Sequence, residues 1–125
     1  MDDKDKIFYM VCRHCCSIMD GWIPYPSTII HYQMPHLSLY KVRKYLKELK
    51  QEGLVDSGLY VDQGEERPIL IRGWLVTKAG QETEAFKKAY ARERQLCAEC
   101  FGFDIGESYK DLNTLSELEA ELGII

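Results

Sequence analysis

The chain opens with apolar residues spaced three or four positions apart, a spacing that places them on one face of a helix. We expect this helix over residues 4–19. Asp2 or Asp3 supplies a carboxylate to cap its start, and Asp20-Gly21 ends it. The apolar positions are Ile7, Val11, Cys15 and Ile18.

A proline-containing segment, "GWIPYPS", follows and is incompatible with a continuing helix. Trp22-Ile23 is expected to form a very short strand. Ser27 is expected to cap a second helix, "STIIHYQM", because serine is a preferred N-cap residue. This helix must be short, since Pro35 interrupts it.

The third helix is the clearest element of the pattern. Ser38 is its expected N-cap, and Val42, Leu46 and Leu49 follow at positions i, i+4 and i+7. Gly53 is expected to end it as the residue just beyond the C-cap, where a left-handed backbone favours glycine. The sequence therefore predicts an amphipathic helix with one buried stripe.

β-branched and aromatic residues dominate the next part of the chain, in "LV", "LYV" and "PILIRGWLV". These runs predict a small antiparallel ribbon with the long tip "DQGEERP". Thr77 is expected to cap a long helix, and Thr114 opens a final short helix that ends near Gly123. The apolar side of the long helix comprises Ala85, Phe86, Ala89, Tyr90, Leu96 and Cys97.

The predicted fold is therefore mostly α with a small β-ribbon, and its order of elements is that of a winged helix-turn-helix with extra C-terminal helices. "VRKYLKELKQEGLV" (Val42 to Val55) and "GWLVTKAG" (Gly73 to Gly80) resemble MarR-like and PadR-like bacterial regulators. The resemblance covers about residues 4–100, and we expect residues 1–100 to form a winged-helix domain that includes the long post-wing helix. It leaves residues 101–125 as an acidic helical extension.

The resemblance implies that the third helix lies in the major groove of double-stranded DNA. It also implies a homodimer, because one such helix contacts only a few base pairs and two half-sites are usually bound together. The first helix and the long helix after the ribbon are the usual dimer contacts in these families. In this chain they carry Phe8, Met19, Phe86 and Tyr90.

Charge is distributed unevenly along the 125 residues, whose net charge is −4. Residues 38–51 hold five cations and one carboxylate, whereas residues 99–125 hold seven carboxylates and one lysine. Two surfaces with different partners are therefore expected. On a helical projection, four side chains of the third helix point away from its buried stripe, and Arg43 lies at the flank. The four are Tyr40, Lys41, Lys44 and Lys47.

Cations and hydroxyls near this helix are the candidates for contacts with phosphates and bases. The acidic tip, with Asp62, Glu65 and Glu66, opposes such contacts, so Arg67 and Arg72 have the alternative of pairing with these carboxylates. The candidate DNA-binding residues are Ser27, Thr28, Ser38, Tyr40, Lys41, Arg43, Lys44, Lys47, Arg67 and Arg72.

Two Cys-x-x-Cys pairs have the spacing of zinc ligands, Cys12 with Cys15 and Cys97 with Cys100. Both fall in predicted helices and neither encloses a turn-forming residue. Free cysteine is often buried as a small apolar residue, so packing is the favoured interpretation. A metal site and a thiol-based sensor remain alternatives, the latter responding to a thiol-reactive or small-molecule effector.

No secretory signal and no uncharged run of about 18 residues is present, so a cytoplasmic protein without a membrane span is expected. Catalytic triads, phosphate-binding loops and paired carboxylates are also absent, which argues against an enzyme and against a cofactor. The sequence thus favours a DNA-binding transcriptional regulator of bacterial or phage type. The alternatives are a winged helix that binds other proteins in a larger assembly and a metal- or thiol-responsive sensor.

Overall fold

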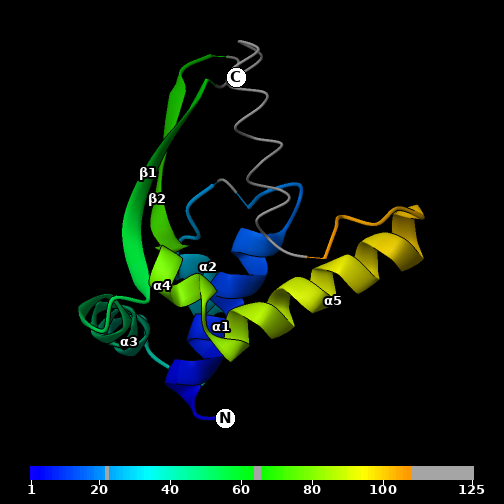
Figure 1. The fold of residues 1–125 in the computed structure, drawn as a ribbon. Coiled ribbons are helices and arrows are strands. Elements are labelled where there is room, and N and C mark those ends of the chain that lie inside the picture. The colour runs from blue at the N-terminus through cyan, green and yellow to red at the C-terminus, as the bar shows by residue number, and fades with distance from the viewer. Residues whose placement is uncertain (22, 64–65, 108–125) are drawn as a thin grey trace.

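The computed structural model describes residues 1–21, 23–63 and 66–107. This part of the chain is mostly helical and carries one long antiparallel hairpin that projects from the helices (Figure 1). The predicted class, mostly α with a small β-ribbon, is confirmed. In chain order the elements are α1 (Asp3–Cys16), α2 (Ser27–Gln33), α3 (Leu39–Gln51), β1 (Val55–Gln63), β2 (Pro68–Val76), α4 (Lys78–Gln81) and α5 (Glu84–Phe101).

Helix α1 begins as predicted but ends before Met19. The carboxylate of Asp2 caps it by accepting a hydrogen bond from the Asp5 N–H at 2.8 Å. At the other end Ser17 adopts an extended backbone, and its Oγ accepts hydrogen bonds from the N–H groups of Met19 and Asp20 at 3.3 and 3.4 Å. A serine hydroxyl that satisfies nearby N–H groups competes with helix continuation, which explains the earlier end.

Helix α2 starts at Ser27, and its N-cap is Pro26, which has an extended backbone and no side-chain hydrogen bond. The prediction that Ser27 caps this helix is therefore wrong. The pairing before α2 involves Tyr25, which exchanges two backbone hydrogen bonds of 3.0 Å with Trp74. The predicted strand at Trp22-Ile23 is thus displaced to Tyr25, and Trp22 lies outside the described residues.

Helix α3 follows the sequence prediction at both ends. Ser38 Oγ accepts a hydrogen bond from the Lys41 N–H at 3.1 Å. Gly53, directly after the C-cap Glu52, has a positive φ of 80°. Its N–H donates to the Lys50 carbonyl at 3.0 Å, which satisfies an end carbonyl of the helix.

The hairpin pairs β1 with β2 from Val55↔Val76 at its base to Gln63↔Pro68 near its tip. Gly73 permits the close approach of the Tyr25 segment, because a Cβ there would lie 2.5 Å from the Tyr25 carbonyl carbon. The base of the hairpin is thereby joined to the chain that leads into α2.

Two helices replace the single long helix predicted after Thr77. Thr77 does cap a helix, since its Oγ1 accepts from the Gly80 N–H at 3.0 Å, but this helix, α4, ends at Gln81. Thr83 then caps α5: its Oγ1 accepts from the Phe86 N–H at 3.3 Å and donates to the Gly80 carbonyl at 2.7 Å. The Thr83 side chain thus satisfies a backbone C=O before it and a backbone N–H after it, and the helix is interrupted at this point. The final helix predicted from Thr114 lies outside the described residues.

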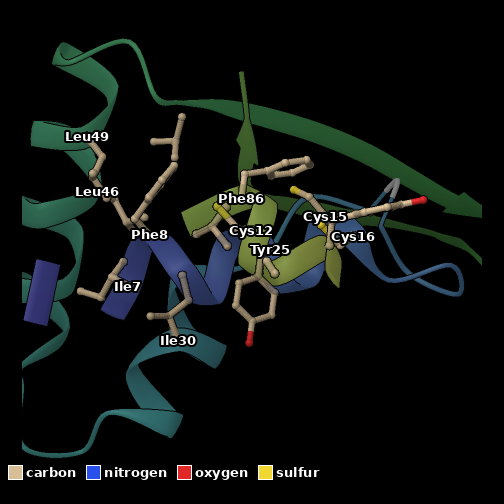
Figure 2. Close-up of a cluster of buried hydrophobic side chains, with 14 of the residues drawn as sticks. Ile7, Phe8, Cys12, Cys15, Cys16, Tyr25, Ile30, Leu46, Leu49 and Phe86 are labelled. Carbon is tan, nitrogen blue, oxygen red and sulfur yellow. The ribbon is translucent and has the colours of Figure 1, made fainter. Parts of the chain in front are cut away.

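The core lies where α1 packs along α5, with α2 and α3 completing it. Figure 2 shows Ile7, Phe8 and the sulfur of Cys12 among the side chains of the neighbouring elements. The core continues past residue 100, because Ile105 is buried and its carbonyl accepts from Tyr90 Oη at 3.2 Å.

An exposed ion pair also fastens residues 103–106 to α5. Arg94 donates to both carboxylate oxygens of Asp104, at 2.6 and 2.8 Å, and Asp104 Oδ1 also accepts from the Gly106 N–H at 3.0 Å. These hydrogen bonds favour the charged carboxylate and lower the pKa of Asp104 to about 2. The segment after α5 is therefore held by both an aromatic hydroxyl and a carboxylate.

Candidate functional site on α3

The exposed face of α3 follows from the burial of its apolar stripe. Val42, Leu46 and Leu49 are buried, so the opposite side of the helix faces solvent. Tyr40 is 78% exposed there. One shallow hollow along this side is lined by Leu39, Tyr40, Arg43, Lys44, Lys47, Glu48 and Gln51. The structure thus brings together four of the predicted contact residues, Tyr40, Arg43, Lys44 and Lys47, and we call these the α3 face.

Two cations near the C-terminal end of α3 are paired with carboxylates. Lys50 Nζ lies 3.4 Å from Asp56 Oδ1, and Lys4 forms an ion pair with Glu52. By contrast, Arg43, Lys44 and Lys47 are exposed and take part in no ion pair within the part of the chain that the structure describes. Only the half-buried carboxylate of Glu48 lies along the same hollow. Three positive charges therefore remain available to an anionic partner.

Two predicted contact residues on α3 have structural roles. Ser38 Oγ is engaged as the N-cap of the helix. Lys41 Nζ lies 5.1 Å from the centroid of the Tyr45 ring, a cation–π geometry, and its side chain is half-buried. Both residues border the α3 face, where the Ser38 hydroxyl is engaged and the Lys41 ammonium keeps its charge but is held over the Tyr45 ring.

The remaining candidates lie at two other places. Ser27 shares a second shallow hollow with Arg72 and Trp74 at the base of the hairpin, and Thr28 is exposed on α2. Arg67 is exposed beside the exposed Glu66 near the hairpin tip. The ten predicted residues are thus divided among α3, the hairpin base with the start of α2, and the hairpin tip.

The cysteines are placed mainly as packing residues. Cys12, Cys15, Cys16 and Cys97 are buried, and Cys100 is exposed. Burial raises the pKa of the Cys16 thiol to about 12 and raises the pKa of Cys12 as well, so both remain protonated at neutral pH. Among residues 1–21, 23–63 and 66–107, no group of three or more His, Cys, Asp or Glu side chains could hold a metal ion.

The two helices expected to form a dimer contact are packed against each other within one chain. Phe8, Phe86 and Tyr90 are 5%, 2% and 6% exposed, so these side chains are already buried. Met19 alone of the four is on the surface, at 70% exposure. Most of the side chains that were expected to contact a second copy are therefore buried in the core of a single chain.

The sequence interpretation missed the exposed apolar side chains of the hairpin, of which Leu59, Val61 and Leu70 share one face and Ile69 lies on the other. Leu59, Val61, Ile69 and Leu70 are exposed by 58%, 46%, 51% and 53%. The signal for it was present in "PILI", where apolar residues occupy consecutive positions and so must face both sides of the strand. Clustered exposed apolar side chains commonly mark an interaction surface.

No helix within the described residues has the length and apolar character to cross a membrane. Comparison with protein-family models, with curated proteins and with solved structures found no match.

Proposed function

We propose that this chain is a winged helix-turn-helix protein that binds double-stranded DNA through α3 and regulates transcription as a dimer. The observation that carries the proposal is the α3 face, where Arg43, Lys44 and Lys47 project from one exposed helical surface without carboxylate partners among the described residues. Such a surface matches the negative charge of a DNA backbone.

The arrangement of the elements supports the same proposal. A short pairing segment at Tyr25 precedes two helices and a hairpin, and it joins the hairpin at Trp74. This is the order expected for a winged helix, with α3 as the recognition helix and β1–β2 as the wing. Ser38 caps the start of α3 and Gly53 follows its C-cap, so α3 presents its exposed side as one continuous helical surface that can enter a groove.

In this proposal α3 lies in the major groove, and the residues on its exposed side have two roles, phosphate contact and base contact. Lysine and arginine donate to phosphate oxygens, which fixes the position of the helix on the duplex. Side chains of the first turns, Tyr40 and Lys44, face the base edges, where a donor distinguishes guanine from adenine. Arg67 and Arg72 are not needed for this docking, since they lie on a hairpin with exposed apolar and acidic residues.

A second candidate function is protein binding by the same fold in a larger assembly. The exposed Leu59, Val61, Ile69 and Leu70 favour it, because a wing that approaches phosphates gains nothing from apolar side chains. The net charge of −4 is also compatible with a protein partner. This candidate uses the hairpin, whereas DNA binding uses α3, so substitutions on the two surfaces separate them.

The test is binding of a random-sequence duplex to the full chain, measured by fluorescence anisotropy with two charge-matched variants. Lys44→Ala/Lys47→Ala removes two cations from the α3 face, and Lys87→Ala/Lys88→Ala removes two exposed lysines from α5. We expect the first variant to bind at least about tenfold more weakly and the second to bind like the wild type. Equal losses in both variants would show that only overall charge matters.

A further inference from the structure

The segment that follows α5 runs back along that helix. Arg94 donates to the Asp104 carboxylate at 2.6 and 2.8 Å, and Tyr90 Oη donates to the carbonyls of Ile105 and Gly106 at 3.2 and 3.1 Å. As the chain proceeds from residue 104 to 106, its partners on α5 therefore lie progressively nearer the start of that helix. Figure 1 shows this return as the orange segment after the end of α5. The chain thus approaches α4, which precedes α5.

The returning chain reaches a groove that extends to the end of α4. Glu107, the last residue of this segment that the structure describes, lines the groove, as do Gln81 and Glu82 at the end of α4. The volume of the groove is about 1030 Å³. Helix α4 begins at Lys78, and β2 ends just before it at Val76. The chain at Glu107 is therefore directed toward the base of the hairpin, and residues 108–125 continue from this point.

The distal half of the hairpin has two faces, and both carry apolar side chains. Side chains alternate along each strand, and cross-strand partners share a face. We call the face on the side of Pro24 the inner face, since a Cβ at Gly58 would lie 3.1 Å from Pro24 Cγ. The apolar residues of the inner face are Tyr60, Ile69 and Ile71. Those of the outer face are Leu59, Val61 and Leu70.

The inner face is the one on the side of α5. Pro24 lies in the segment that follows α1, and this segment is held to α1 because His14 Nε2 is hydrogen-bonded to the Ile23 carbonyl at 2.6 Å. Helix α1 in turn packs along α5. In Figure 1 both helices accordingly lie on one side of the hairpin. A segment that arrives from α5 therefore meets the inner face before the outer one.

The inner face also has the character of a surface that packs against another element. Ile69 is 51% exposed, and Tyr60 and Ile71 are half-buried. A two-stranded hairpin is only marginally stable alone, and packing against a helix or further strands stabilises it. An amphipathic helix is therefore the kind of partner that fits this face.

The sequence of residues 108–125 supplies such a helix. Leu115, Leu118 and Leu122 are spaced by three and four positions, which places them on one helical face, and carboxylates occupy other positions of the same stretch. A helix over residues 114–123 is about 15 Å long. The strand from Val76 to Ile69 spans about 23 Å, and residues 108–113 can bridge up to about 20 Å. The helix can therefore lie along the distal half of the hairpin.

We propose that residues 108–125 pack as an amphipathic helix along the inner face of the hairpin, with Leu115, Leu118 and Leu122 against Tyr60, Ile69 and Ile71. The outer face stays exposed. The carboxylates of this helix lie beside the hairpin, where they repel phosphate, so the hairpin is unsuited to contact a DNA backbone. The packing itself does not rest on DNA binding.

Backbone NMR of the full chain tests the packing with two neighbouring substitutions in β2. Ile69→Lys places a charge on the inner face, whereas Leu70→Lys changes an equally exposed residue on the outer face, 53% against 51%. We expect Ile69→Lys to shift the amide signals of residues 115–122 and to make their hydrogen exchange at least about tenfold faster. Leu70→Lys should leave both unchanged, and circular dichroism verifies that both variants fold.

A reciprocal pair of substitutions in the acidic segment tests the same contact from the other side. Leu118→Glu changes the apolar face of the helix, whereas Ala120→Glu changes its opposite face. We expect Leu118→Glu, and not Ala120→Glu, to shift the amide signals of Tyr60, Ile69 and Ile71.

Several results would overturn the proposal. Equal effects of Ile69→Lys and Leu70→Lys would place the segment elsewhere, as would shifts on α3 or α5 instead of the hairpin in Leu118→Glu. Unprotected amides throughout residues 115–122 in the wild type would show that no such helix packs there. A dimer that dissociates in Leu118→Glu during sedimentation equilibrium would show that the segment binds a second copy.

Discussion

Arg13 on α1 and Glu93 on α5 form an ion pair, with 3.2 Å between Arg13 Nη2 and Glu93 Oε2. Arg13 Nη1 also donates to the Ala89 carbonyl at 2.9 Å. The Glu93 carboxylate accepts a weak hydrogen bond from the Cys97 thiol at 3.8 Å. Glu93 is only 9% exposed and the Arg13 side chain is 26% exposed, so the pair joins the two helices at the edge of the core.

Replacing Glu93 by alanine should destabilise the protein by about 2 kcal/mol, because the Arg13 guanidinium would lose a charged partner in a largely desolvated place. Urea unfolding followed by circular dichroism measures this change. Glu84→Ala is the matched control, since its ion pair with Lys87 is exposed and should contribute about 0.5 kcal/mol or less. Similar losses in both variants would contradict a structural role for the α1–α5 pair.

Gly73 and Gly58 are directly opposite each other in the hairpin but should respond differently to alanine. A Cβ at Gly73 would meet the backbone of Tyr25 at 2.5 Å, whereas at Gly58 the nearest atom is the flexible Leu75 Cδ1 at 2.8 Å. We expect Gly73→Ala to cost about 1–3 kcal/mol and Gly58→Ala clearly less. Thermal unfolding measures the difference, and a larger loss for Gly58→Ala would show that Tyr25 does not bridge to Trp74.

The five cysteines should divide sharply in their reaction with a thiol reagent. Four are buried, and burial keeps the Cys12 and Cys16 thiols protonated by raising their pKa, whereas Cys100 is exposed. We expect one rapidly modified thiol per native chain and five after unfolding, counted with Ellman's reagent. Two or more rapidly modified thiols in the native chain would contradict this prediction and would support the hypothesis of a thiol sensor on α1 or α5.

The sequence predicted the fold best where a local signal acts alone. The side chains of Asp2, Ser38 and Thr77 cap helices because each hydroxyl or carboxylate reaches a nearby N–H group. Prediction was wrong where two local signals compete. Ser17 ended α1 early, and Thr83 provided a second cap that split the expected long helix.

Only part of the candidate site could be predicted from the sequence, because some of its properties depend on contacts between distant segments. Helical spacing suffices to place Lys44 and Lys47 on the exposed side of α3. The pairing of Lys50 with Asp56 depends on how the hairpin leaves α3, and the burial of Phe86 depends on α1 lying along α5. These contacts join segments far apart in the sequence, and no local pattern encodes them.

The most direct measurement is the salt dependence of duplex binding by the wild type and by Lys44→Ala/Lys47→Ala, from about 50 to 200 mM salt. If α3 docks on phosphates, wild-type affinity should fall steeply, and the logarithmic slope should be smaller by about 2 in the variant, one for each lysine removed. Identical slopes for the two proteins, or no binding by the wild type at the lowest salt, would contradict DNA binding through α3.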